Sequence, residues 1–151
     1  MQRQGPDQRS AMADGSWMAW TAVGIAGIWV AVVLISIRAP DMVSGSEQEH
    51  MQVAAFGTWL WGLVATGAFL LMMGRLRGSA RRMPVWIGLS VTTVAIWLVA
   101  AILSITLPVV ETGSDPTRIP VGALVAPIAA AVLTIVAGIT ASVFARPPTP
   151  D

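Results

Sequence analysis

The 151-residue chain contains no cysteine, no lysine and no tyrosine, and it has a single histidine. Without cysteine it can form no disulfide and no thiolate metal site. With one histidine, cysteine-based and two-histidine catalytic mechanisms are excluded. Charge is scarce too, because Asp, Glu, Lys and Arg make up 11% of the residues, against roughly 25% in an ordinary soluble domain. These deficits argue against an enzyme.

Apolar residues dominate what is present: 55% of the chain is hydrophobic and the mean hydropathy is +0.71. Four runs exceed the ~20 apolar residues that cross a ~30 Å hydrocarbon layer, and none has a charged residue in its interior. The sequence therefore predicts an all-α fold, an integral membrane four-helix bundle within residues 17–145, with spans at about 17–38, 52–74, 84–107 and 120–144. We expect residues 1–16 to be a disordered tail and 146–151 an extended one.

Arginine is distributed unequally between the two sides of such a bundle. Seven arginines lie in the N-terminal tail, the loop after the second span and the C-terminal tail, and only Arg38 and Arg118 lie in the other two loops. Since basic residues favour the cytoplasmic side, both termini should be cytoplasmic. We expect a multi-pass protein of a bacterial plasma membrane.

The two halves of the chain are similar at an offset of 68 residues. Residues 29–55 align without a gap on 97–123, and the polar loop motif P-x4-G-S followed by an acid occurs in both. A duplication of two helical hairpins would explain this. Because each copy has two spans, the predicted arrangement is two parallel hairpins related by a pseudo-twofold axis along the membrane normal.

Small residues recur at a spacing of four in the second helix of each hairpin. Because residues four apart lie on one helix face, and small residues let helices approach closely in lipid, we predict packing faces there. In the second span these residues are Ala54, Thr58, Gly62, Thr66 and Gly74, and in the fourth span they are Gly122, Ala126, Ala130, Thr134, Gly138 and Ser142.

The stretch SGSEQEHMQ, residues 44–52, holds the only histidine, His50. Ser46 and Glu49 have the spacing of a helix-capping box, and Ser114 is the counterpart of Ser46 in the second copy. Capping is the favoured interpretation. The alternative is an outward-facing cation or pH sensor, for which the only metal-ligand candidates are Glu47, Glu49, His50, Glu111 and Asp115.

No cofactor is expected. The spans hold no histidine to ligate haem, and the glycines follow neither the GxxxxGK[ST] nor the GxGxxG pattern. A channel or transporter component remains open as an alternative, with hydroxyls such as Thr58, Thr66, Ser104 and Thr134 as pore-lining candidates. Helix packing is favoured for these hydroxyls, because in helices they usually bond to the preceding turn.

Tryptophans fall at two depths of the predicted bundle. Trp17, Trp20 and Trp86 lie near the cytoplasmic ends of the spans, where indoles often anchor a helix. Trp29 and Trp97 lie nearer mid-span, at equivalent positions of the two copies. They are expected to fill space beside the small-residue faces, with a lipid or quinone contact as the alternative.

A short tail, four apolar spans and the outward SGSEQEH loop together resemble small uncharacterised membrane proteins of high-G+C Gram-positive bacteria, mainly over residues 29–134. That resemblance implies no activity. The expected function is a non-enzymatic accessory, assembly or scaffold subunit of a membrane complex, or a small homo-oligomer. Its partners would be the lipid bilayer and another membrane protein or a second copy, and not nucleic acid.

Overall fold

The computed structural model describes the backbone of residues 6–41, 48–76, 83–107, 110–112, 117–119 and 121–145, and the side chains of residues 15–37, 56–76, 84–107 and 121–145. Within these ranges the chain forms the helices α1 (Pro6–Asp41), α2 (Gln48–Leu76), α3 (Met83–Thr106) and α4 (Val121–Phe144). The short strands β1 (Val110–Thr112) and β2 (Thr117–Ile119) form an antiparallel pair between α3 and α4.

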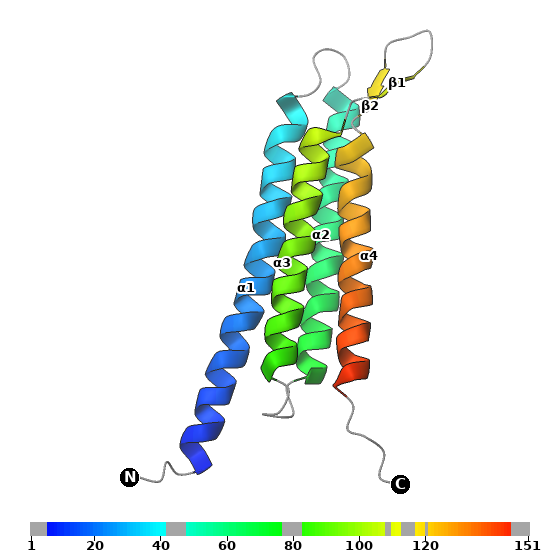
Figure 1. Cartoon of the computed structure of the whole chain (residues 1–151). Helices are drawn as coiled ribbons and strands as arrows, with labels where there is room; N and C mark the ends of the chain where they lie inside the picture. Colours follow the sequence, from blue (N-terminus) through cyan, green and yellow to red (C-terminus); the bar gives the residue numbers. More distant parts are fainter. Residues whose placement is uncertain are drawn as a thin grey trace.

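Each of the four helices contains a segment long and apolar enough to cross a membrane. These segments are Gly15–Ile37, Phe56–Leu76, Pro84–Thr106 and Val121–Phe144. Consecutive helices run in opposite directions, so α1 begins and α4 ends at the same end of the bundle (Figure 1). In lipid a spanning segment must satisfy its own backbone hydrogen bonds, which a helix does. The prediction of a bundle of four helices, each long and apolar enough to span a membrane, is confirmed in this coarse form.

The structure differs from the sequence prediction at the N-terminus. Residues 6–16, expected to be disordered, are helical, because α1 begins at Pro6. Proline suits the first helical position, since its fixed φ is already helical. Once a span has nucleated a helix, adding residues such as those of QRSAMAD requires no new nucleus. As a result α1 has 36 residues and extends beyond the other helices at this end (Figure 1).

The segment after α3 also differs from expectation, because part of it pairs as strands. Val110 lies opposite Ile119, Glu111 opposite Arg118, and Thr112 opposite Thr117. Ser114, which the sequence predicts as a cap at the entry to the last helix, lies outside the described residues, so its capping role stays a prediction. α4 begins at Val121, after β2.

The helices form a ring in the order α1, α3, α4, α2. α1 packs against α2 and α3, and α4 packs against the same two helices, whereas α1 and α4 meet only briefly across a diagonal. A twofold axis along the membrane normal that exchanged the hairpins would place α1 and α3 on opposite corners. Here they are neighbours, so the predicted pseudo-twofold arrangement is not the one that forms. The two hairpins lie side by side instead.

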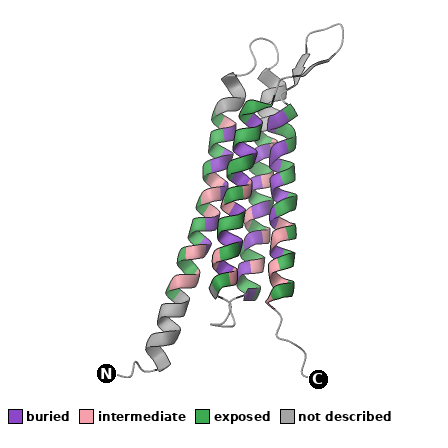
Figure 2. Ribbon diagram, viewed as in Figure 1, coloured by how far each residue is buried: buried purple, intermediate pink, exposed green. Residues whose placement is uncertain are grey.

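Burial follows the inside of this ring. Figure 2 shows buried positions where the helices face one another and exposed positions on the outward faces of the described segments. The largest fully buried side chains include Trp97, Phe69, Ile28, Ile35 and Met73. Large apolar side chains also cover the outward faces, among them Phe56, Leu71 and Phe144. This is the distribution expected when the surrounding solvent is lipid.

Candidate functional site

Glycine lies at every interface between neighbouring helices of the ring. A Cβ atom built on Gly27 of α1 would lie 2.5 Å from Val94 Cγ2 of α3, and one on Gly62 of α2 would lie 2.7 Å from Val32 Cγ2 of α1. One on Gly138 of α4 would lie 2.6 Å from Met72 Cγ of α2. Real Cβ atoms do not approach other atoms so closely, so alanine at any of these glycines would force the neighbouring side chain to shift.

The tightest approach to backbone occurs between α3 and α4, at Gly122. Its added Cβ would lie 3.1 Å from both the Leu103 carbonyl oxygen and Ser104 Cα, and 3.0 Å from Leu107 Cβ. Backbone cannot rotate away as a side chain can. Gly122 therefore fixes how closely the first turn of α4 lies against the last turn of α3.

The face predicted on α4 lies in the interior of the bundle. Its buried members are Gly122, Ala126, Ala130, Thr134 and Gly138, and Ser142 is half-buried. Because α4 contacts both α2 and α3, the neighbouring positions Ala123, Pro127 and Ala131 are buried as well. The buried face is therefore two residues wide rather than a single stripe.

On α2 the predicted face follows the interior only at its start. Thr58 and Gly62 are buried, Thr66 is half-buried and Gly74 is exposed, while the side chain of Ala54 lies outside the described ranges. The observed buried face combines steps of three and four residues, and positions at a constant step of four move away from it along the helix. Its members are Thr58, Gly62, Ala65, Phe69, Met73 and Leu76.

Sequence reasoning missed two packing residues, Gly24 and Gly27 in α1. An added Cβ on Gly24 would overlap the ring of Phe69 on α2, and Gly27 faces α3. In the structure the buried positions of α1 recur at steps of three and four, at Thr21, Gly24, Ile28, Ala31 and Ile35, which is the pattern of a packed helix face. The sequence contains little signal of it, because α1 is apolar on its outward faces as well.

Polar side chains inside the bundle bind one helix to another. Trp97 Nε1 of α3 donates to Thr134 Oγ1 of α4 at 3.2 Å, and Thr134 Oγ1 donates to the Ala130 carbonyl at 2.8 Å. Ser90 Oγ of α3 donates to the Trp20 carbonyl of α1 at 2.9 Å. Each bond satisfies a group that would otherwise be unpaired in an apolar interior.

Two indoles bind the last turn of α2. Trp17 Nε1 of α1 donates to the Met73 carbonyl at 3.1 Å, and Trp86 Nε1 of α3 donates to the Leu76 carbonyl at 2.9 Å. The last four carbonyls of a helix have no partner within it. The sequence predicted these tryptophans as interfacial anchors. In the structure they act as helix caps supplied by neighbouring helices, and Trp86 is 2% exposed.

Most of the hydroxyls considered as a pore lining are committed to their own helices. Thr66 Oγ1 donates to the Gly62 carbonyl and Ser104 Oγ to the Ala101 carbonyl, as Thr134 does to Ala130. Thr58, Ser104 and Thr134 are each less than 5% exposed. Thr93 Oγ1 is the one buried side-chain polar atom without a hydrogen-bond partner among the residues whose side chains are described.

The mid-span tryptophans have different surroundings although they align in sequence. Trp97 is fully buried, whereas Trp29 is half-buried, with its ring centroid 5.3 Å from that of Trp59 on α2 and the two planes tilted by 58°. Trp29 also lines an apolar depression on the outer face of α1, of about 380 Å³. Trp97 donates its indole N–H to Thr134 inside the bundle.

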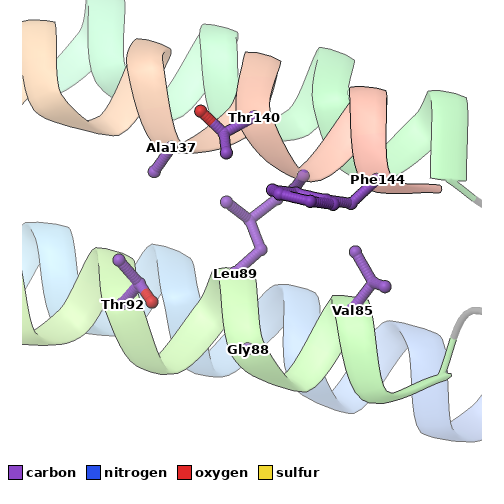
Figure 3. A pocket seen from close by; sticks show the side chains of 8 residues that line it. Val85, Gly88, Leu89, Thr92, Ala137, Thr140 and Phe144 are labelled. Atoms are coloured by element: carbon purple, nitrogen blue, oxygen red, sulfur yellow. The ribbon is translucent and has the colours of Figure 1, made fainter.

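A groove of about 360 Å³ follows the outer seam between α3 and α4 (Figure 3). The lining is small or apolar apart from two threonines, and consists of Val85, Gly88, Leu89, Thr92, Ala137, Thr140, Ala141 and Phe144. Leu89 and Phe144 lie in the space between the two helices (Figure 3). Further along the same seam is a smaller cavity of about 70 Å³, lined by residues that include Ile96, Ala100 and Ala130.

The candidate cation ligands lie outside the described side chains. Glu49 and His50 are in the first turn of α2, and Glu111 is in β1 opposite Arg118. Glu47 and Asp115 lie outside the described residues. The capping candidates Ser46 and Ser114 lie outside them as well. Among the residues whose side chains are described, no three His, Asp or Glu are close enough to share a metal ion.

Comparison with known proteins found no matching family model, no matching curated protein and no matching solved structure.

Proposed function

We propose that this protein is a non-enzymatic accessory, assembly or scaffold subunit of a bacterial plasma-membrane complex, or a small homo-oligomer, with both termini cytoplasmic. The observation that carries this proposal is how the polar groups of the spans are used. Trp97, Ser90, Trp17 and Trp86 donate hydrogen bonds from one helix to another. Their role is to hold the bundle together.

The absence of charge in the spans supports the same proposal. The four spanning segments contain no Asp, Glu, Lys or His, and Arg75 near the end of α2 is their only arginine. Proton- and ion-coupled carriers keep ionisable groups at membrane depth because these groups move the coupling ion. A scaffold needs none. The bonds from Thr66, Ser104 and Thr134 to their own helices also favour packing over a hydrated path.

The test is a native mass measurement of the full chain extracted in mild detergent, combined with pull-down from native membranes. We expect the protein to run as an assembly larger than one 15.8 kDa chain, either with copies of itself or with one stoichiometric membrane protein. A strict monomer with no co-purifying partner would contradict the proposal. Solute flux into vesicles containing the purified protein alone would favour the channel alternative instead.

A further inference from the structure

We propose that the groove between α3 and α4 holds one acyl chain of an anionic phospholipid, with the headgroup at the arginine-rich end of the bundle. The proposal goes beyond a scaffold role, because it assigns a specific lipid to one face of the protein. It rests on the shape of the groove, the chemistry of its lining and the charge at the end where it opens.

The shape suits a thin, flexible chain. The lining spans Val85–Thr92 on α3, which corresponds to a rise of roughly 11 Å along the helix. Gly88, Ala137 and Ala141 supply the small side chains that leave the space open. A helix about 10 Å across would occupy roughly 800 Å³ over the same rise, more than twice the groove's 360 Å³. The groove is therefore too small to enclose a helix of a partner.

The lining suits hydrocarbon. Thr140 Oγ1 donates to the Val136 carbonyl at 2.8 Å, so its hydrogen is committed to its own helix. Leu89 and Phe144 present apolar surface in the space between the helices (Figure 3). An acyl chain in this groove would exchange bilayer contacts for closer contacts with fixed side chains, which favours binding through packing.

The positive charge at the end of the bundle where the groove opens favours an anionic headgroup. The groove begins at Val85, in the first turn of α3, and at Phe144, the last residue of α4. At the same end α2 finishes with an exposed Arg75 in its last turn. In the sequence, the segment from 75 to 82 that joins α2 to α3 has four arginines and no acidic residue. Basic groups near a membrane surface attract anionic lipids.

The experiment measures lipid retained by the purified full chain in native mass spectrometry. Dioleoyl phosphatidylglycerol and dioleoyl phosphatidylcholine are added separately at equal concentrations. We expect wild type to retain one phosphatidylglycerol, and to retain phosphatidylcholine several-fold less. Gly88→Leu should lower phosphatidylglycerol affinity about tenfold, because its four-carbon side chain occupies part of the groove and removes packing contacts of the acyl chain.

The matched control is Gly67→Leu, on the exposed face of α2. An added Cβ at Gly88 or at Gly67 meets nothing within 4 Å, so both variants should fold. Gly67→Leu should retain phosphatidylglycerol as wild type does. Equal retention by the two variants, or equal affinity for the two lipids, would overturn the proposal. Loss of a dimer mass in Gly88→Leu with lipid retention unchanged would also overturn it, in favour of a second copy on this face.

Discussion

Trp97 on α3 and Thr134 on α4 are joined by a hydrogen bond from the indole Nε1 to Oγ1, 3.2 Å long. Both residues are buried, with exposures of 0% and 2%. The pair is chemically asymmetric. Thr134 also donates to the Ala130 carbonyl at 2.8 Å, so its own hydrogen has a partner without Trp97. The indole N–H, in contrast, would lose the acceptor that the structure gives it if the hydroxyl were removed.

This asymmetry predicts different outcomes for two substitutions of Thr134. Thr134→Val keeps the shape but leaves the indole N–H unpaired in an apolar interior, and should lower the free energy of unfolding by about 1–2 kcal/mol. Thr134→Ser keeps the hydroxyl and deletes one buried methyl group, so its loss should be smaller, about 0.5–1 kcal/mol. Denaturation in mixed detergent micelles measures both values. Equal losses in the two variants would show that the methyl group matters and the bond does not.

Alanine substitutions at two of the glycines should change the free energy of unfolding in opposite directions. Gly27→Ala introduces a Cβ 2.5 Å from Val94 Cγ2 and 3.3 Å from Val94 Cα, and should destabilise the bundle by about 1–3 kcal/mol through overpacking. Gly67→Ala adds a Cβ that meets nothing within 4 Å. It should raise stability by up to about 1 kcal/mol, since alanine favours a helix interior more than glycine. The same unfolding measurement compares the two.

A stabilised Gly27→Ala variant would mean that α1 and α3 can separate at little cost, and that Gly27 is not needed for their packing. Gly138→Ala gives an independent check on the other side of the ring, where the nearest atom is Met72 Cγ at 2.6 Å. Methionine is flexible and can move aside. The loss there should therefore be smaller than at Gly27.

The spans could be predicted from the sequence because each is a continuous apolar run of sufficient length. The interior face of α4 could be predicted too, since Gly122, Ala126, Ala130 and Gly138 repeat at steps of four and remain buried. On α2 the same step departs from the buried face. Which residues of α2 are buried depends on which neighbouring helices it contacts. The hydropathy of the sequence does not contain that information.

The order of the helices around the ring could not be predicted for a related reason. Sequence similarity between the hairpins identifies equivalent segments but not which sides of them meet. Trp29 and Trp97 align, yet Trp29 is half-buried with its ring tilted against that of Trp59, while Trp97 is fully buried. Side-by-side packing places the two copies in different surroundings. The duplication itself stays a prediction.

The indole caps predict a local effect at the end of α2. Trp86→Phe removes the donor to the Leu76 carbonyl, whose residue is 1% exposed. The last turn of α2 should then open more often, and its amide hydrogens should exchange about fivefold faster or more. Hydrogen–deuterium exchange read by mass spectrometry on a peptide covering 70–76 measures this rate.

The control for this measurement is Trp59→Phe, the same substitution at a residue that is 45% exposed on the outward face of α2. It should leave exchange in the last turn unchanged. An equal acceleration in both variants would mean that loss of indole volume loosens α2 generally. No acceleration in Trp86→Phe would mean that water or lipid replaces the indole as a partner of the Leu76 carbonyl.

The topology can be tested cleanly because the chain has no cysteine to mask. Ser79→Cys lies in the arginine-rich segment between α2 and α3, and Ser44→Cys lies in the segment between α1 and α2. If basic residues fix the orientation, a membrane-impermeant maleimide should label Ser44→Cys in intact bacterial cells and Ser79→Cys only after lysis. The reverse pattern would place both termini outside. It would also put the anionic lipid proposed for the α3–α4 groove in the outer leaflet, so the labelling decides in which leaflet that lipid should be sought.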